Sequence, residues 1–502
     1  MAKVKFEVPE LTGEITIPGL KEDAAASSRS QNAPAKDMID LGFPTELVPD
    51  WKEKAIAKFD ELLKKYRSLK VFMDICVKCG SCTDKCHFYL GTKDPRNMPV
   101  ARAELLRKVY RRYFTTAGKV LGKLAEAEDL TKEVLEEWYT YFYQCSECRR
   151  CSVFCPYGID TAEITMATRE MMDVVGVGAK YPLQTINKAI TVGNNLGMPG
   201  PAIRSTLDFM EEDVKEQTGV PVKFPMDVKG ADVLLVTPSA DFFATPHVES
   251  LAGYAKVFHQ AGISWTLSSY ASEAGNFGMF NGNYEHMRKI AGRIKVAIQE
   301  LKPKRLIHGE CGHAWRAAYS FWNTLIGPFD KLGLDPRYPA PQHICEFTYD
   351  LINRGALKLD KTANDDFVVT FHDSCNVARA SRMGNSPGGQ FEIPRAIIRA
   401  SCNKFVDMHP DTIREKTFCC GAGGGLLADE IIDLRIKGVM PRMQAYKAVK
   451  DSHGANFFAL ICAICKAQFT KVFPYYGYEM EEVGGVHQLV SRAIVLGGKE
   501  GI

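Results

Sequence analysis

The stretch CVKCGSCTDKC, residues 76–86, decides the fold, and its pattern returns as CSECRRCSVFC over residues 145–155. Each stretch spaces its cysteines as C-x2-C-x2-C-x3-C, the spacing of the bacterial iron–sulfur run, in which the fourth cysteine ligates the other cluster. The sequence therefore predicts two 4Fe–4S cubanes. We expect Cys76, Cys79, Cys82 and Cys155 to hold the first cubane, and Cys145, Cys148, Cys151 and Cys86 to hold the second.

Zinc is the alternative metal, because C-x2-C pairs also bind it and each run would fill one zinc site alone. The same spacing occurring twice favours iron–sulfur. His87 stands where the first run would have a proline, and 58 residues with helical patterning separate Cys86 from Cys145. From residue 51, WKEKAIAKFDELLKKYRSL also spaces its apolar residues as a helix does. Residues 51–175 therefore resemble an α-helical ferredoxin domain.

Composition excludes several classes of protein. The chain has 502 residues, 63 basic and 60 acidic side chains and a formal charge of +3, so it has no strongly basic face for nucleic acid. Its 16 cysteines do not indicate secreted disulfides, because the start MAKVKFEVPE has no apolar signal region. The longest apolar run has about nine residues, against about 20 for a membrane helix. We expect a cytoplasmic, soluble or peripheral protein whose thiols serve metal or redox chemistry.

A second set of cysteines lies in the C-terminal part of the chain. Adjacent thiols do not suit one tetrahedral zinc ion, but they can hold two irons of an enlarged cluster. The glycine run after the pair, GAGGG from Gly421, would let the backbone pack closely there. It is a poor dinucleotide fingerprint, and we expect neither flavin nor NAD in this chain. The second set comprises Cys375, Cys419, Cys420, Cys462 and Cys465.

From about residue 230, short apolar strands alternate with helical stretches, which predicts α/β units with parallel sheets. The strands are expected within 231–238, 305–310, 366–373 and 455–465. LIHGECGHAW (306–315) aligns with LICAICKAQF (460–469), and VLLVTPSA (233–240) aligns with VVTFHDSC (368–375), so two copies of one domain are expected. The predicted divisions are an extended N-terminal arm (1–50), the helical ferredoxin domain (51–175), a helical linker (176–229), a first α/β copy (230–350) and a second (351–502).

The arrangement resembles heterodisulfide reductase-type proteins, whose cysteine-rich CCG domain carries the pattern C…CCG…C-x2-C. The resemblance covers residues 51–502 and implies an α + α/β fold, with a helical ferredoxin domain followed by two repeated CCG domains. In that family the complete set binds a noncubane 4Fe–4S cluster that cleaves disulfides. It implies that the noncubane ligands here are the five cysteines of the second set.

The first copy departs from the family pattern. Ala240, the Ala274–Gly275 region and His308 stand where ligands would be, and only Cys311 survives. We therefore expect one noncubane cluster rather than two. His308 and Cys311 are nonetheless candidate catalytic residues, together with His313 and His372, because a thiolate leaving group needs a proton or a nearby positive charge. A structural hydrogen-bonding role is the alternative for each histidine.

The degenerate first copy, the single intact set and the long arm resemble the DsrK branch of the family, the catalytic iron–sulfur subunits of DsrMKJOP complexes. This resemblance implies that electrons from a quinol pool pass through a cytochrome b-type membrane subunit like DsrM to the cubanes. They would then reduce a disulfide or trisulfide of the small sulfur-carrier protein DsrC. Other implied partners are subunits like DsrJ, DsrO and DsrP, with this chain attached peripherally to the cytoplasmic membrane.

Two other interpretations also fit the sequence. The chain also resembles electron-relay iron–sulfur subunits of flavin-dependent hydroxyacid or glycerol-3-phosphate dehydrogenases, and a zinc-binding scaffold is the non-catalytic alternative. The direction of electron flow does not follow from the sequence. Cys345 and Cys402 match no ligand position and are expected to be buried small side chains, although Cys345 lies at the junction of the copies, where an extra ligand or a substrate-binding thiol is the alternative.

Overall fold

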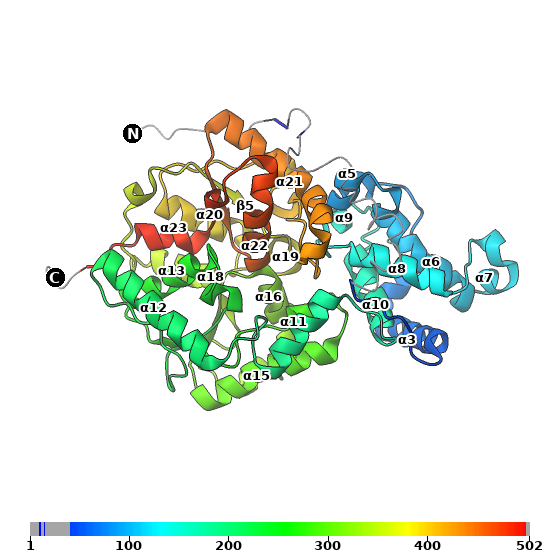
Figure 1. Cartoon of the computed structure of the whole chain (residues 1–502), viewed down its shortest axis with the longest axis horizontal. Coiled ribbons are helices and arrows are strands. Elements are labelled where there is room, and N and C mark those ends of the chain that lie inside the picture. The colour runs from blue at the N-terminus through cyan, green and yellow to red at the C-terminus, as the bar shows by residue number, and fades with distance from the viewer. Residues whose placement is uncertain (1–9, 12–14, 16–40, 498–502) are drawn as a thin grey trace.

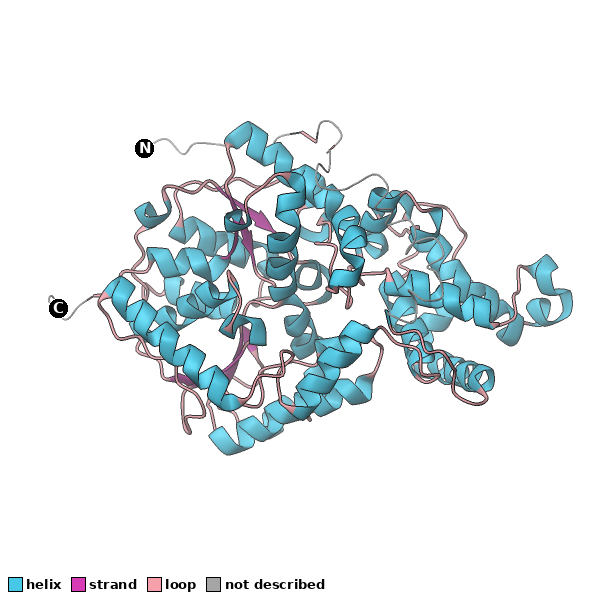
Figure 2. Ribbon diagram, viewed as in Figure 1, coloured by secondary structure: helices cyan, strands magenta, loops and turns pink. Residues whose placement is uncertain are grey.

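The computed structural model describes residues 10, 11, 15 and 41–497, and it has a helical body beside two small, helix-covered sheets (Figures 1 and 2). The predicted α + α/β fold is confirmed. Most of the predicted N-terminal arm, 1–50, lies outside the described residues. Of its apolar residues, Leu11 and Ile15 pack against the core of the α/β half of the chain itself.

The helical body begins with α3 (Trp51–Lys65), whose predicted apolar face is buried. Ala55, Phe59 and Leu62 on that face are at most 1% exposed. They pack in one core with Trp138 and Met171 from later helices, so the region between the cysteine runs folds around side chains and not around the metals alone. The other helices of the body are α4 (Arg67–Asp74), α5 (His87–Thr92), α6 (Pro99–Phe114), α7 (Thr116–Leu121), α8 (Lys132–Tyr143), α9 (Arg150–Val153) and α10 (Thr161–Asp173).

Two helices, α11 (Lys180–Thr191) and α12 (Gly200–Thr218), lead from the helical body to the first sheet. That sheet is parallel, with strand order β2-β1-β3-β4, and the second sheet is parallel with order β5-β6-β7. Each of the four predicted strand regions contains a strand. The strands are β1 (Val233–Val236), β2 (Trp265–Thr266), β3 (Arg305–His308), β4 (Gln342–His343), β5 (Val369–His372), β6 (Phe457–Leu460) and β7 (Val483–Gly485).

The two sheets repeat one topology. β1, β3 and β4 correspond in order to β5, β6 and β7, and a bridge from Val369 to Phe405 stands where β2 pairs with β1. The short strands β2, β4 and β7 were not predicted, because two or three residues are too few to show a pattern. The covering helices are α13 (His247–Gln260), α14 (Asn276–Phe280), α15 (Tyr284–Leu301), α16 (Gly312–Ala317), α17 (Asn323–Leu325), α18 (Ile344–Asn353), α19 (Cys375–Ala380), α20 (Gly389–Ser401), α21 (Ile432–His453), α22 (Ala463–Val472) and α23 (Val486–Ala493).

Helices of the two copies pack against each other. Helix α13 of the first copy packs on α23 of the second, and α18 at the end of the first copy packs on α20 of the second. A fully buried ion cluster lies at this junction. Glu310 accepts hydrogen bonds from Lys466 Nζ at 2.6 Å, and its other oxygen lies 2.7 Å from His487 Nδ1. Lys466 also donates to Ser250. A buried carboxylate needs such partners, so the cluster fixes how the two copies meet.

One buried arginine joins the helical body to both copies. Arg169 on α10 is inaccessible to solvent and pairs with Glu147 at 2.9 Å. Its guanidinium also donates to four main-chain carbonyl oxygens, at distances of 2.6–3.2 Å. The carbonyl groups belong to Phe142 and Cys145 of the helical body, Phe280 of the first copy and Gly424 of the second.

Arg169→Met is expected to lower the free energy of unfolding by about 3–5 kcal/mol, because it leaves Glu147 and several carbonyl groups buried without their cation. Arg204→Met is the matched control. Arg204 lies on α12, partly exposed, and pairs with Asp208 and Glu211, so its loss is expected to cost about 0–1 kcal/mol. Anaerobic chemical denaturation of both variants measures the difference. Equal losses would contradict the role given to Arg169.

Candidate metal centres

A cavity between the loop before α5 and the end of the second run is lined by four of the predicted ligands. Cys76, Cys79, Cys82 and Cys155 all face it, as does Cys151. Cys79 is exposed to solvent. The structure therefore brings the fourth cysteine of the second run to the first three of the first run. This is the set that the sequence assigned to the first cubane.

A second cavity lies deeper, and Cys86, Cys145, Cys148 and Cys151 line it. Arg102, which is buried, reaches the same cavity and donates to Tyr141 O and Asn97 Oδ1. Burial opposes the charge of Arg102, but the nearby Cys145 and Cys86 thiolates raise its pKa. A fixed cation beside four thiolates suits a metal cluster with net negative charge, so the residues present fit the predicted second cubane.

The cysteines of the second set gather in one buried cluster. Side-chain contacts run from Cys375 to Cys419, Cys420, Cys465 and Cys462, and then to Cys311 of the first copy. All six are at most 3% exposed. Cys375 begins α19 after β5, and the Cys462–Cys465 pair brackets the start of α22 after β6, so adjacent parallel strands deliver them to the same edge.

The glycine run holds this third site against the helical body. Gly424 has φ +66°, and a Cβ there would lie 2.8 Å from the carbonyl oxygen of Cys145. No larger residue fits without moving that carbonyl group. The run therefore brings the chain just after Cys420 into contact with a predicted ligand of the second cubane.

His87, the residue that replaces the usual proline of the first run, lies between the second and third sites. Its Nδ1 lies 2.7 Å from Gly438 O on α21, and its Nε2 lies 2.7 Å from Ser146 Oγ. Burial alone would lower the pKa of His87, but the neighbouring Cys419 and Cys148 thiolates raise it well above the ordinary value. The sequence marked His87 as a departure from the pattern without indicating this position.

The predicted histidines divide into two groups. His313 Nδ1 lies 3.4 Å from Cys462 Sγ, and His372 Nε2 lies 3.6 Å from Cys465 Sγ, so both contact the third site. Burial lowers the pKa of His372 to about 3, which keeps its ring neutral. His308 is instead buried beside Gly309 O and two tryptophan rings, and burial lowers its pKa to about 4.

Aromatic side chains occupy the part of the first copy that corresponds to the third site. Trp322 is fully buried, its ring centroid lies 6.1 Å from that of His308, and its indole nitrogen donates to Ala274 O at 2.9 Å. Ala274 stands where the second copy has its cysteine pair. Cys311, in contrast, points to Cys462 of the second copy. The first copy thus contributes a thiol to the other copy's site.

The two remaining cysteines lie elsewhere. Cys345 is buried at the junction of the copies, where its sulfur is within 4.8 Å of the ligating atoms of Glu310 and His487. Both carboxylate oxygens of Glu310 are already bound, one by Lys466 and the other by His487. Cys345 therefore borders an ion cluster whose charges are paired. Cys402 is buried at the end of α20, and burial raises the pKa of its thiol to about 12. Both are buried small side chains, as their sequence positions predicted.

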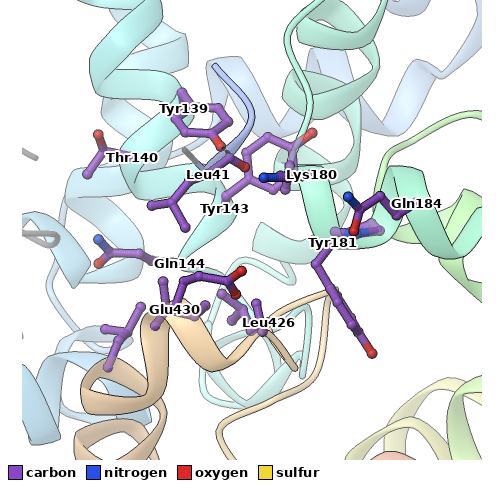
Figure 3. A pocket seen from close by; sticks show the side chains of 16 residues that line it. Leu41, Tyr139, Thr140, Tyr143, Gln144, Lys180, Tyr181, Gln184, Leu426 and Glu430 are labelled. Atoms are coloured by element: carbon purple, nitrogen blue, oxygen red, sulfur yellow. Dashed lines mark hydrogen bonds between the residues drawn. The ribbon is translucent and has the colours of Figure 1, made fainter. Parts of the chain in front are cut away.

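A cavity of about 110 Å³ opens beside the glycine run (Figure 3). Its walls come from α8, from the start of α11 and from the chain leading into α21. Tyr139 and Tyr143 line one side, and Lys180 and Glu430 bring opposite charges to it. Gly425 forms part of the wall, so the cavity reaches the loop that follows the cysteine pair.

Comparisons with known proteins agree with this division. The family described as 4Fe-4S dicluster domain matches residues 72–159, and the cysteine-rich domain family matches residues 369–470. The chain is 43% identical to Hdr-like menaquinol oxidoreductase iron-sulfur subunit 2 of Archaeoglobus fulgidus, over 92% of this chain and 86% of the relative. It is 42% identical to the Hdr-like menaquinol oxidoreductase iron-sulfur subunit of Archaeoglobus profundus, over 90% of this chain and 84% of the relative. It is 26% identical to one subunit of the dihydromethanophenazine:CoB–CoM heterodisulfide reductase of Methanosarcina mazei, over 78% and 87%.

The arrangement of the first two cavities predicts which signals each mutation changes. Cys86→Ser is expected to alter the cluster held by Cys145, Cys148 and Cys151, and Cys155→Ser to alter the one held by the first run, because each fourth ligand lies in the other run's cavity. Electron paramagnetic resonance of the anaerobic, reduced variants distinguishes the two. If Cys86→Ser changed the same signal as Cys76→Ser, the exchange of ligands would be wrong.

Proposed function

Because the chain belongs to the family of Hdr-like menaquinol oxidoreductase iron–sulfur subunits, we propose that it passes electrons through two cubanes to a third cluster that reduces a sulfur–sulfur bond. It is an iron–sulfur oxidoreductase with a 4Fe–4S dicluster domain and a cysteine-rich domain. The order of the clusters, the noncubane type of the third and its substrate are proposals.

The contact between the second and third sites carries the proposal. Cys148, a predicted ligand of the second cubane, and Cys419, of the third site, interact with each other and with the same imidazole of His87. The first cavity shares Cys151 with the second. The three sites thus form a series that begins at the exposed Cys79 and ends at cysteines buried in the second copy. A series of this kind supports stepwise transfer from an external donor to a protected site.

The third site would hold a noncubane 4Fe–4S cluster through Cys375, Cys419, Cys420, Cys462 and Cys465, with Cys311 beside them. When bound, such a cluster supplies electrons one at a time at a point where sulfur can ligate iron. The proposed reaction converts one disulfide, two electrons and two protons into two thiols. The chain's own part is to exclude water from the site and to place His313 and His372 beside it.

A substrate must reach cysteines that are at most 3% exposed. The cavity in Figure 3 supports an approach along the glycine run, because Gly425 and Leu426 line it five and six residues after Cys420. Its aromatic and apolar walls suit an extended peptide segment better than a small charged disulfide. We therefore favour a disulfide or trisulfide carried on a protein arm, as on a DsrC-like sulfur carrier.

The wider assembly is also proposed from the relatives. Membership of the DsrK branch would place the chain with a cytochrome b-type subunit that takes electrons from menaquinol, and with subunits like DsrJ, DsrO and DsrP. Two relatives are named as parts of menaquinol oxidoreductases, which supports a membrane-bound donor. No helix among the described residues has the length and hydrophobicity needed to cross a bilayer. Peripheral attachment to the cytoplasmic membrane would come through these partner subunits.

Anaerobically purified protein is expected to contain about 12 irons per chain, four in each of three clusters. Cys419→Ser should lower the iron content by about four and remove the signal of the oxidised third cluster, while both cubane signals remain. Cys402→Ser is the matched control, since Cys402 is equally buried but lies away from every site. Bound zinc in a colourless protein, or a cubane signal lost in Cys419→Ser, would contradict the assignment.

Reduced viologen should be oxidised when a DsrC-like protein with its disulfide formed is added to the purified chain. Cys419→Ser is expected to slow this reaction about 100-fold, because it disrupts the cluster that meets the substrate. Cys402→Ser should leave the rate unchanged. If the wild-type protein did not oxidise reduced viologen but accepted electrons from a separate flavoprotein, the chain would instead be an electron relay.

A further inference from the structure

The segment 116–125, which we call the tip, consists of α7 and the 3-10 turn Gly122–Ala125 (η3) that follows it. It stands out from the helical body at the end of the molecule remote from α12 (Figure 1). The tip folds back sharply on α6, because a Cβ at Gly118 would lie 2.0 Å from Arg111 O and only glycine permits this approach. Most other residues of the tip are exposed to solvent, namely Thr116, Ala117, Lys119, Val120, Leu121, Lys123 and Leu124.

Three large apolar side chains of the tip are exposed. Val120 is 77% exposed, Leu121 is 53% exposed and Leu124 is 89% exposed. Single apolar residues on a surface need no explanation, but three within five residues on one projection form a concentrated apolar feature. In contrast, Trp138 and Phe142 of α8 and Met171 of α10 are buried in the core of the helical body.

Lysines alternate with these apolar residues. Lys119 and Lys123 are exposed, and in the described part of the chain neither ammonium group lies within ion-pair distance of a carboxylate. The sequence from residue 105 to residue 125 contains six basic residues and no aspartate or glutamate. The basic residues at the base of the tip, Lys108, Arg111 and Arg112, are already paired with carboxylates.

We propose that the tip binds directly to a membrane surface, with Val120, Leu121 and Leu124 in the headgroup region and Lys119 and Lys123 on anionic lipid phosphates. Leucine beside lysine on one short projection suits the interface of a bilayer, where apolar carbons and anionic groups lie a few ångströms apart. A protein partner is the less favoured occupant, because lysine is depleted in the cores of protein interfaces.

The base of the tip is tied to the first cubane site. Lys78, between Cys76 and Cys79, forms ion pairs of 2.6 Å with Glu126 and 3.3 Å with Glu104. Glu126 directly follows the tip, so a membrane contact there would hold the exposed Cys79 side of the first site near the bilayer. Attachment through the tip does not depend on which sulfur compound the third site reduces.

The test uses the full-length, cluster-loaded protein and vesicles of phosphatidylcholine with about 30% phosphatidylglycerol. Wild-type protein is expected to sediment with these vesicles and to do so less at high salt. The triple variant Val120→Ser, Leu121→Ser, Leu124→Ser should bind at least about tenfold more weakly, and Lys119→Gln with Lys123→Gln should remove the salt dependence. In Leu124→Trp, lipids with brominated chains should quench the added fluorescence.

A matched control carries Phe209→Ser, Val228→Ser and Val296→Ser, which change three exposed apolar residues outside the tip. It should bind vesicles as the wild type does. The rate of viologen oxidation with the sulfur carrier should be the same in all variants. A protein that binds vesicles but does not oxidise viologen would contradict the proposed function and leave the membrane contact supported. The proposal would be overturned if the wild-type protein did not bind the vesicles, or if the tip variant bound them equally well. Binding only to an isolated membrane subunit would overturn it too.

Discussion

The buried guanidinium of Arg169 is the constraint on which the arrangement of the three sites depends. It fixes the carbonyl groups of Cys145 and Gly424, which belong to different parts of the fold, at 2.8 Å each. Cys145 opens the second cysteine run, and Gly424 follows the cysteine pair of the third site. Because one rigid, planar group holds both, the second and third sites cannot shift independently. Glu147 provides the countercharge that makes this burial tolerable.

His87 continues the same connection on the other side of the second run. Its ring is held by Gly438 O of α21 and by Ser146, and it borders thiols of both sites. A proline at this position would have no side-chain nitrogen to make these two contacts. The departure from the usual run is therefore explained by packing of the ferredoxin-like body onto the second copy. The proposed electron transfer between the second and third sites would need a short, fixed separation, and the contacts of Arg169 and His87 hold the two sites together.

The two α/β copies share a topology but differ in what fills the strand ends. In the second copy five cysteines converge there, and in the first copy Trp322 and His308 occupy the corresponding volume. Close packing leaves no large void in a protein interior, and the buried indole of Trp322 helps to fill this part of the first copy. Cys311 belongs to the first copy by sequence, but its side chain contacts Cys462 of the second copy. Its role therefore has to be sought at the third site.

By itself the sequence determined the fold class and the repeat, and it predicted the cysteine sets of the three sites, because cysteine spacing and the alternation of apolar strands with helices are local patterns. It predicted four of the strands, the buried face of α3 and the exchange of fourth cysteines between the runs. Only the tertiary structure decided which histidines meet the third site, that Cys311 faces the other copy, and that Arg169 and His87 join the parts. These depend on contacts between residues up to 351 positions apart, as between His87 and Gly438. No local pattern records such a contact, because packing of whole domains brings the two residues together.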